Sequence, residues 1–230
     1  MKAVVVIVIV LLLAACGPSV QEQRAAAQAA AAAKAEREAA EQAVLYQRNL
    51  DAGEIELAAA YAELIIARYP RSQAAQSIAP GFAAIREQAK AARETRRLES
   101  LWSYQTSAIG GGTQRTATIY SEDGASPHVQ LVLRQHTQWG LSVFLLPGSD
   151  IFRCVRCTAT LKTDQGASSR SAVTKSTSKE NPALFIDDEK AFLRVLETAQ
   201  QVTIEVPVND GQRSLQFSVG GYQPKRFVTP

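Results

Sequence analysis

Hydrophobic and polar positions change their spacing near Ser100, and this change divides the chain into a helical half and a β half. From Gln21 to Leu50 the sequence has no Pro or Gly and is rich in strong helix formers such as Ala, Gln, Glu and Arg. This pattern predicts one long helix. Its first part lacks large hydrophobic residues and can bury little surface. We therefore expect a solvated stalk, with an alanine-seamed coiled coil or a disordered segment as the alternatives.

Two shorter helices are predicted between residues 51 and 99, where they form a helical hairpin. Gly53 is typical of a residue that follows a helix end. The next helix repeats hydrophobic residues at helical spacing and ends before Pro70. Ser72 is the predicted N-cap of the last helix, which Pro80-Gly81 should kink or interrupt.

This hairpin contains Leu50, Gly53, Ala58 and the segment ARYPRS at residues 67–72. With these residues, the stretch 46–80 resembles a tetratricopeptide hairpin. One such unit is present, and repeat folds generally need about three units to be stable alone. The resemblance implies either a peptide-binding groove or ordinary structural packing, and the sequence leaves both open.

Beyond Ser100 the hydrophobic residues alternate, which predicts antiparallel β-strands. The clearest case is HVQLVLRQ, in which Val129, Leu131 and Leu133 share one face. The first strands are expected at residues 101–108, 114–121, 128–135, 140–146 and 152–162. Two further strands at 201–208 and 214–221 flank Asn209-Asp210-Gly211, a strong hairpin signal. A glycine run at 110–112 joins the first two strands.

Residues 165–182 are polar and show no hydrophobic period, so they predict a mobile loop. Its Arg170, Lys175 and Lys179 either remain solvated or contact acidic lipid headgroups or glycan. The predicted fold class is therefore α+β: Ala-rich N-terminal helices (stalk plus helical hairpin), then an antiparallel β-sandwich-like domain with one late helix. That helix covers Glu189–Gln200 and follows a short strand at 183–188.

The β half opens with Trp102 and contains the segments ATIYS (117–121), VQLVLR (129–134) and LQFSVGG (215–221). In this order, and with a phenylalanine-bearing late helix, they are similar to a periplasmic accessory-protein family associated with type VI secretion. The resemblance implies a non-enzymatic role in the cell envelope and carries over no site residue.

The chain begins with Lys2 and an apolar run from Ala3 to Ala15. As a helix this run spans about 20 Å, short of the roughly 30 Å hydrocarbon core of a bilayer. A short apolar run after a basic residue is typical of a signal peptide. The run ends in Leu13-Ala14-Ala15-Cys16, which resembles the lipobox of bacterial lipoproteins.

The lipobox resemblance implies that residues 1–15 are removed and that Cys16 is lipidated, palmitate included, because stable anchoring takes more than one acyl chain. It also implies an outer-membrane location facing the periplasm, since Gly17 replaces the aspartate that retains such proteins in the inner membrane. The predicted segments are a lipid anchor with stalk at 16–50, the hairpin at 51–99 and the β-rich domain at 100–230.

Two cysteines remain for the β half, Cys154 and Cys157, and an oxidising compartment favours a disulfide between them. A regular strand would separate their Cα atoms by roughly 10 Å, so the disulfide requires a turn or bulge. A redox pair is the first alternative. A zinc site with His128 and His136 is the second.

Catalytic chemistry is not indicated. The sequence has no G-x-S-x-G elbow, and Asp187 and Asp188 are better explained as a helix cap than as paired carboxylates. A formal net charge of +3 argues against a dedicated nucleic-acid binder. We expect no catalytic residue, metal, cofactor or small-molecule substrate. The predicted function is a non-enzymatic scaffold or adaptor in envelope or secretion assembly, with a protein partner. Alternatives are an inhibitor or immunity lipoprotein that blocks a toxin or cell-wall hydrolase, and an envelope enzyme.

Overall fold

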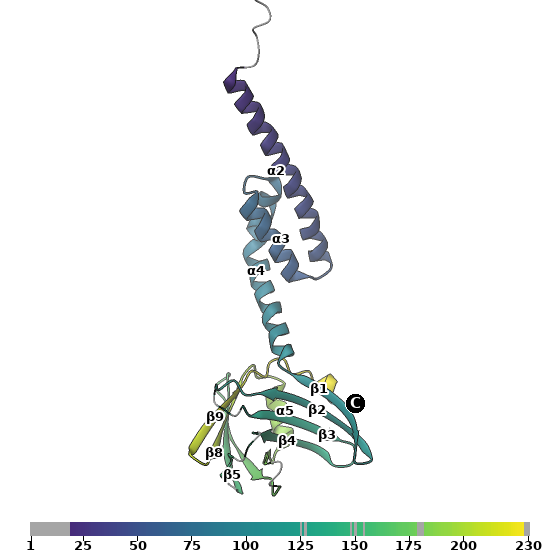
Figure 1. Ribbon diagram of the computed structural model, residues 1–230, viewed down its shortest axis with the longest axis vertical. Coiled ribbons are helices and arrows are strands. Elements are labelled where there is room, and N and C mark those ends of the chain that lie inside the picture. Colours follow the sequence, from purple (N-terminus) through teal and green to yellow (C-terminus); the bar gives the residue numbers. More distant parts are fainter. Residues whose placement is uncertain are drawn as a thin grey trace, which may run out of the picture. The chain divides into compact units, whose positions relative to one another are not determined.

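A computed structural model describes residues 19–124, 126, 128–147, 149, 151–153, 155–178 and 182–227. Its internal contacts divide the chain into a helical unit that ends at Ala92 and a β unit that begins at Arg93. Along the chain the long helices come first and a curled β-sheet follows (Figure 1). The predicted signal peptide and Cys16 lie outside the described residues.

The long predicted helix is α2, Val20–Asp51. Ser19 begins it with a capping box, because its Oγ accepts the N–H of Glu22 at 3.2 Å and the Glu22 carboxylate accepts the Ser19 N–H at 2.6 Å. Gly53 ends it with φ 75°, and the N–H groups of Gly53 and Glu54 bond to carbonyls of the last helical turn. The predicted role of Gly53 is confirmed.

Helices α3 (Ile55–Arg68) and α4 (Gln73–Ser100) follow. Ser72 caps α4 as predicted, since its Oγ accepts the N–H of Ala75 at 3.1 Å. Pro80 lies inside α4 and does not interrupt it. Ile78 and Ala89, on either side of Pro80 in this helix, are both buried.

All three helices contribute to a small core in the helical unit. Its buried residues are Ala62, Ile65, Ala75 and Ile78, with Ala43, Tyr46 and Phe82 packed against them. By contrast, every residue from 19 to 34 is exposed. Only the first part of α2 is therefore solvated along its whole circumference, and the second part is packed.

The β unit is one nine-stranded antiparallel sheet in the order β1-β2-β3-β4-β7-β6-β5-β8-β9, which confirms the α+β fold class. The strands are β1 Ser103–Ile109, β2 Gly112–Tyr120, β3 Gln130–His136, β4 Gly140–Leu146, β5 Arg156–Thr163, β6 Ser168–Lys175, β7 Leu184–Ile186, β8 Val202–Val208 and β9 Gly211–Phe217. The late helix is α5, Glu189–Leu196, and a short helix α6 covers Pro224–Phe227.

Two hairpins form where the turn residues predicted them. Gly110 and Gly111, with φ 57° and 75°, connect β1 to β2 in a two-residue loop. Asn209 and Asp210 connect β8 to β9, with Val208 opposite Gly211. Both loops need residues that tolerate positive φ or a tight turn, which is why the sequence identifies them.

The sheet curls around a single hydrophobic core. Figure 1 shows β1 to β4 on one side of the curl and β5, β8 and β9 on the other. Inward-facing Leu133 of β3 and Ile204 of β8 belong to the same buried cluster, which also includes Phe192 and Leu196 of α5. The two layers of the sandwich-like domain are thus halves of one sheet.

The predicted mobile loop at 165–182 is wrong for residues 168–175, which form β6. This strand pairs with β5 on one side and β7 on the other. Val173 is its only buried residue, and small polar residues such as Ser171 fill the other inward positions. The hydrophobic period was therefore hidden, and backbone pairing on both sides determines the strand.

The predicted strand at 152–162 begins later than expected, at Arg156. Phe152 instead makes an isolated bridge to Val208 and is fully buried. The late helix ends at Leu196, before the predicted end at Gln200. Asp188 caps this helix, because its Oδ1 accepts the Ala191 N–H at 2.9 Å.

The segment after β2 covers the free edge of β9. The Glu122 N–H donates to the Gln216 carbonyl at 2.8 Å, and Arg213 pairs with Asp123 at 2.8 Å. Of the two end strands of the sheet, β9 is thus partly protected by this segment.

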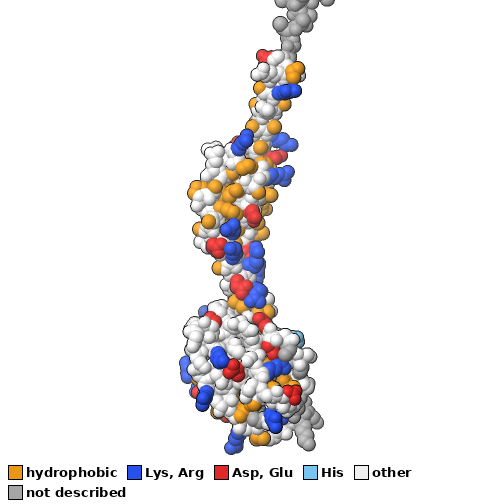
Figure 2. All heavy atoms as spheres, turned by 90° about the vertical axis from the view of Figure 1, so that its left-hand side faces the viewer, with side chains coloured by type: hydrophobic (Ala, Val, Ile, Leu, Met, Phe, Trp, Pro, Cys, Tyr) orange, Lys and Arg blue, Asp and Glu red, His pale blue; other side chains and the backbone are white. Residues whose placement is uncertain are grey.

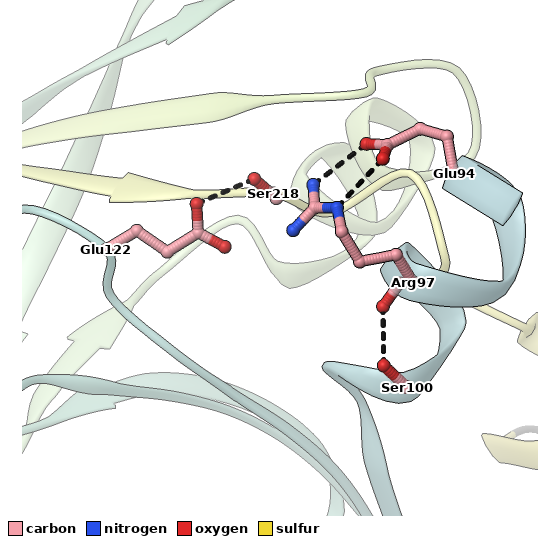
Figure 3. A network of polar contacts seen from close by, with 5 residues as sticks. All are labelled: Glu94, Arg97, Ser100, Glu122 and Ser218. Carbon is pink, nitrogen blue, oxygen red and sulfur yellow. Dashed lines mark hydrogen bonds and ion pairs between the residues drawn. The ribbon is translucent and has the colours of Figure 1, made fainter. Parts of the chain in front are cut away.

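The last turns of α4, which belong to the β unit, reach the same region. Figure 3 shows Arg97 paired through two nitrogens with Glu94, at 2.8 Å each, and Glu122 accepting the Ser218 hydroxyl. The hydrogen bonds from Arg97 lower the pKa of the Glu94 carboxyl. Ser100 donates to the Arg97 carbonyl at 2.7 Å and ends the helix.

Candidate binding face

Strands β1 to β4 turn alternate side chains away from the core, and we call the surface that these side chains form the outer face. A hollow of about 430 Å³ lies on it. The register sets Thr116 of β2 and Ser142 of β4 on either side of Arg134 in β3. The residues that line the hollow are Ser103, Gln105, Gln114, Thr116, Thr118, Tyr120, Gln130, Val132, Arg134, Phe144 and Leu146.

Arg134 is the central charged group of this hollow. Its guanidinium lies over the Phe144 ring, 5.3 Å from the centroid, and donates from Nη2 to the Ser142 hydroxyl at 3.2 Å. Its Nε is buried and has no hydrogen-bond partner among the described residues. A buried N–H without an acceptor costs about 1–3 kcal/mol.

The outer face continues to His136, which lies opposite Gln114. His136 is fully buried, and its Nδ1 accepts the N–H groups of Gln138 and Trp139 at 3.1 and 3.3 Å. Nε2 therefore carries the proton and donates to the Ile109 carbonyl at 2.9 Å. The Trp139 ring stacks on this imidazole, with 3.7 Å between the two ring centroids. His136 thus holds two hairpins together.

The zinc alternative loses support from this geometry. Both ring nitrogens of His136 are occupied by hydrogen bonds, and His128 is exposed in the segment before β3. The described part of the chain contains no group of three His, Cys, Asp or Glu side chains arranged for a metal ion. Cys154, the other ligand considered, lies outside the described residues.

Two exposed aromatic rings mark the ends of the outer face. Tyr120 is 59% exposed at one end and Trp139 is 53% exposed near the other. From Tyr120 to Gln114, β2 covers roughly 20 Å at 3.3 Å per residue. Between these ends, the lining residues that the structure describes carry amides, hydroxyls, apolar side chains and one arginine, and none of them is a carboxylate.

Cys157 lies at the start of β5, half-buried against the core. β5 begins at Arg156, one residue before Cys157. Cys154 lies outside the described residues, so the Cys154–Cys157 disulfide stays a prediction.

The remaining candidate residues have structural contacts. Asp188 is the helix cap described above, and Asp187 accepts the Thr174 hydroxyl at 3.1 Å. Lys175 donates to the Phe152 carbonyl at 2.8 Å, and Arg170 is exposed on β6. Lys179 lies outside the described residues. The two aspartates therefore hold α5 and β6 in place.

Helix α3 is apolar on two sides. Its buried side consists of small residues and Ile65, whereas Leu57 and Leu64 are 52% and 39% exposed, with half-buried Tyr61 between them. We call Leu57, Ala60, Tyr61 and Leu64 the α3 stripe. Figure 2 shows hydrophobic side chains gathered over the packed part of the helical unit, while on the side shown the β unit has only scattered hydrophobic and charged side chains.

Sequence reasoning did not identify the outer face. Its signal was present in ATIY at 117–120, where Thr118 and Tyr120 alternate with buried Ala117 and Ile119. The pattern indicates that these residues point outward, but not that four strands form a hollow with Arg134 at its centre.

None of the helices in the described ranges combines the length and hydrophobicity needed to cross a bilayer. Comparisons of the chain with protein-family models, curated proteins and solved structures give no match.

Proposed function

We propose that the protein is a lipid-anchored, non-enzymatic adaptor of the bacterial outer membrane that faces the periplasm and binds an envelope component. The observation that carries this proposal is the outer face. Its hollow combines the guanidinium of Arg134, one nitrogen of which lacks a partner among the described residues, with hydroxyls, amides and a partly apolar floor. Such a concave surface with convergent polar groups is typical of a binding site.

The start of α2 supports a tethered position for this binding protein. Residues 20–34 are helical and exposed on all sides, and they add roughly 22 Å at 1.5 Å per residue. They follow the predicted lipidation site Cys16 closely in the chain. A helix of this kind serves as a spacer between a lipid anchor and the packed part of the helical unit.

The α3 stripe supports the expected protein partner. A helix with apolar side chains on both sides buries the second side only against another element. Leu57, Tyr61 and Leu64 follow the spacing with which helices pack on each other. We assign this stripe to an amphipathic helix of an envelope protein.

The anchor and the outer face are tested together in a bacterial host that processes lipoproteins. Cys16→Ser should abolish labelling with an azido-palmitate analogue and release the chain from the membrane fraction. A photo-crosslinking amino acid at Thr118, in the hollow, should give envelope adducts that Arg134→Gln reduces. The control places the same crosslinker at Thr160, a half-buried threonine of β5 that lies outside the hollow.

Two results would overturn this proposal. Retention of label and membrane association by Cys16→Ser would exclude Cys16 as the lipid anchor. Equal adducts from Thr118 and Thr160, or none from Thr118, would exclude the outer face as the binding surface.

The α3 stripe is tested by a crosslinker at exposed Ala60. A protein adduct is expected that Leu64→Lys removes and Glu63→Lys leaves unchanged. Because Leu64 is already partly exposed, thermal unfolding followed by helical circular dichroism should shift little. An adduct that persists in Leu64→Lys would show that the stripe does not bind the partner.

A further inference from the structure

We infer that the outer face binds a linear oligosaccharide that carries carboxylate groups, with Arg134 placed on one carboxylate. This inference rests on the proposed function of the outer face as the binding surface of the adaptor. It adds the chemical class of the ligand, which follows from the charge, the hydrogen-bonding groups and the aromatic rings of the face.

The charge of the hollow selects a single anionic group. Among the described residues that line it, Arg134 is the only charged side chain and none is acidic. One guanidinium matches the single charge of a carboxylate, and its fork of N–H donors fits the two carboxylate oxygens. The Phe144 ring and the Ser142 hydroxyl fix the orientation of the guanidinium.

The uncharged groups around Arg134 match a ligand rich in hydroxyls. Gln105, Gln114 and Gln130 each offer an amide that donates and accepts, and Thr116 and Thr118 offer hydroxyls that do the same. Sugar hydroxyls require partners of both kinds. A peptide backbone is instead recognised by the N–H and C=O groups of a strand edge, whereas this face presents only side chains.

The two exposed rings complete the resemblance to a sugar-binding surface. Tyr120 and Trp139 offer flat apolar faces, on which the C–H side of a sugar ring packs. Trp139 is held rigidly, because it stacks on His136 and lies so close to Gly110 that an added Cβ would approach its Cζ2 to 2.6 Å. An aromatic ring whose orientation is fixed before binding loses little conformational entropy on binding. The stretch of β2 from Tyr120 to Gln114, roughly 20 Å long, is sufficient for several linked sugar rings.

The test is isothermal titration of the full chain in detergent with tetragalacturonate and tetramannuronate. At least one of these carboxylated tetrasaccharides should bind saturably. Arg134→Gln should weaken that binding at least about tenfold, because it removes a charge-assisted hydrogen bond. Tyr120→Ala should weaken it about threefold or more. The matched variant is Arg170→Gln, which changes an exposed strand arginine of β6 and should leave the affinity within twofold.

The ligand controls separate charge from shape. The methyl-esterified tetrasaccharide keeps the hydroxyls and loses the charge, so wild type and Arg134→Gln should bind it equally weakly. Tryptophan fluorescence shows whether each variant is folded. If Arg134→Gln does not fold, the wild type alone provides the test. It should bind the acidic tetrasaccharide more tightly than the methyl ester.

Several outcomes would overturn the inference. They are the absence of saturable binding to both acidic tetrasaccharides, equal affinity for acid and ester, or tighter binding of tetraglutamate or inorganic phosphate. If the Thr118 crosslink in cells persists in that case, the adaptor function stands and the saccharide assignment is wrong. If the crosslink fails as well, the adaptor function and the saccharide assignment are both wrong.

Discussion

Asp123→Asn is expected to destabilise the β unit by about 2 kcal/mol, because it breaks the ion pair that ties the segment after β2 to β9. Arg213 Nε lies 2.8 Å from Asp123 Oδ2, and the two side chains are only 14% and 10% exposed. Breaking a buried ion pair by removing one partner costs about 3–5 kcal/mol. This pair retains some solvent contact, and Asp123 Oδ1 has no hydrogen-bond partner among the described residues, so we expect about 2 kcal/mol.

The same ion pair gives a pH dependence with a definite sign. Burial raises the pKa of Asp123, but hydrogen bonds from Arg213 and Ser121 and the charge of Arg213 outweigh it, so the pKa is lower than usual. The folded state therefore binds this proton less tightly than the unfolded chain. The stabilisation is present above the unfolded pKa of about 3.9 and disappears as the pH falls through the folded pKa. The difference between wild type and Asp123→Asn should shrink accordingly in acid.

Guanidinium unfolding followed by tryptophan fluorescence measures this effect, because both tryptophans, Trp102 and Trp139, lie in the β unit. A double-mutant cycle of Asp123→Asn with Arg213→Gln isolates the coupling. Lys162→Gln is the control, since it breaks an exposed pair and should cost less than about 1 kcal/mol. A loss below about 0.5 kcal/mol, or a difference that stays constant down to pH 3, would show that this ion pair does not stabilise the β unit.

Three further predictions concern the two cysteines of the β half and two glycines. Mass spectrometry of the unreduced, alkylated protein should find Cys154 and Cys157 protected from alkylation; two alkylated thiols would refute the disulfide. Gly110→Ala should destabilise the β unit by about 1–2 kcal/mol, because φ at this residue is 57° and the new Cβ meets the Trp139 ring. An unfolding midpoint at the same denaturant concentration as the wild type would contradict this. Gly81→Ala should stabilise α4 by about 0.5–1 kcal/mol, as measured by circular dichroism, because it has open space and an ordinary helical backbone.

Local patterns in the sequence determined the helices, the turns and most strands. The capping of α4 by Ser72, the helix end at Gly53 and the hairpin at Asn209-Asp210 each depend on residues next to each other in the chain. Such features need no distant partner, so one stretch of sequence is enough to predict them. The α+β class followed from the change of period near Ser100 for the same reason.

Only the tertiary structure decided which faces are buried and where the binding face lies. The period of α3 fits Leu57 and Leu64 as core residues, yet Ala58 and Ala62 are buried instead, because small residues let helices approach closely. Strand β6 exists because β5 and β7 pair with it on both sides. Arg134 acquires its surroundings from Thr116, Ser142 and Phe144, which three strands bring together by register. Contacts between residues far apart in the chain leave no local period, so a single sequence does not reveal them.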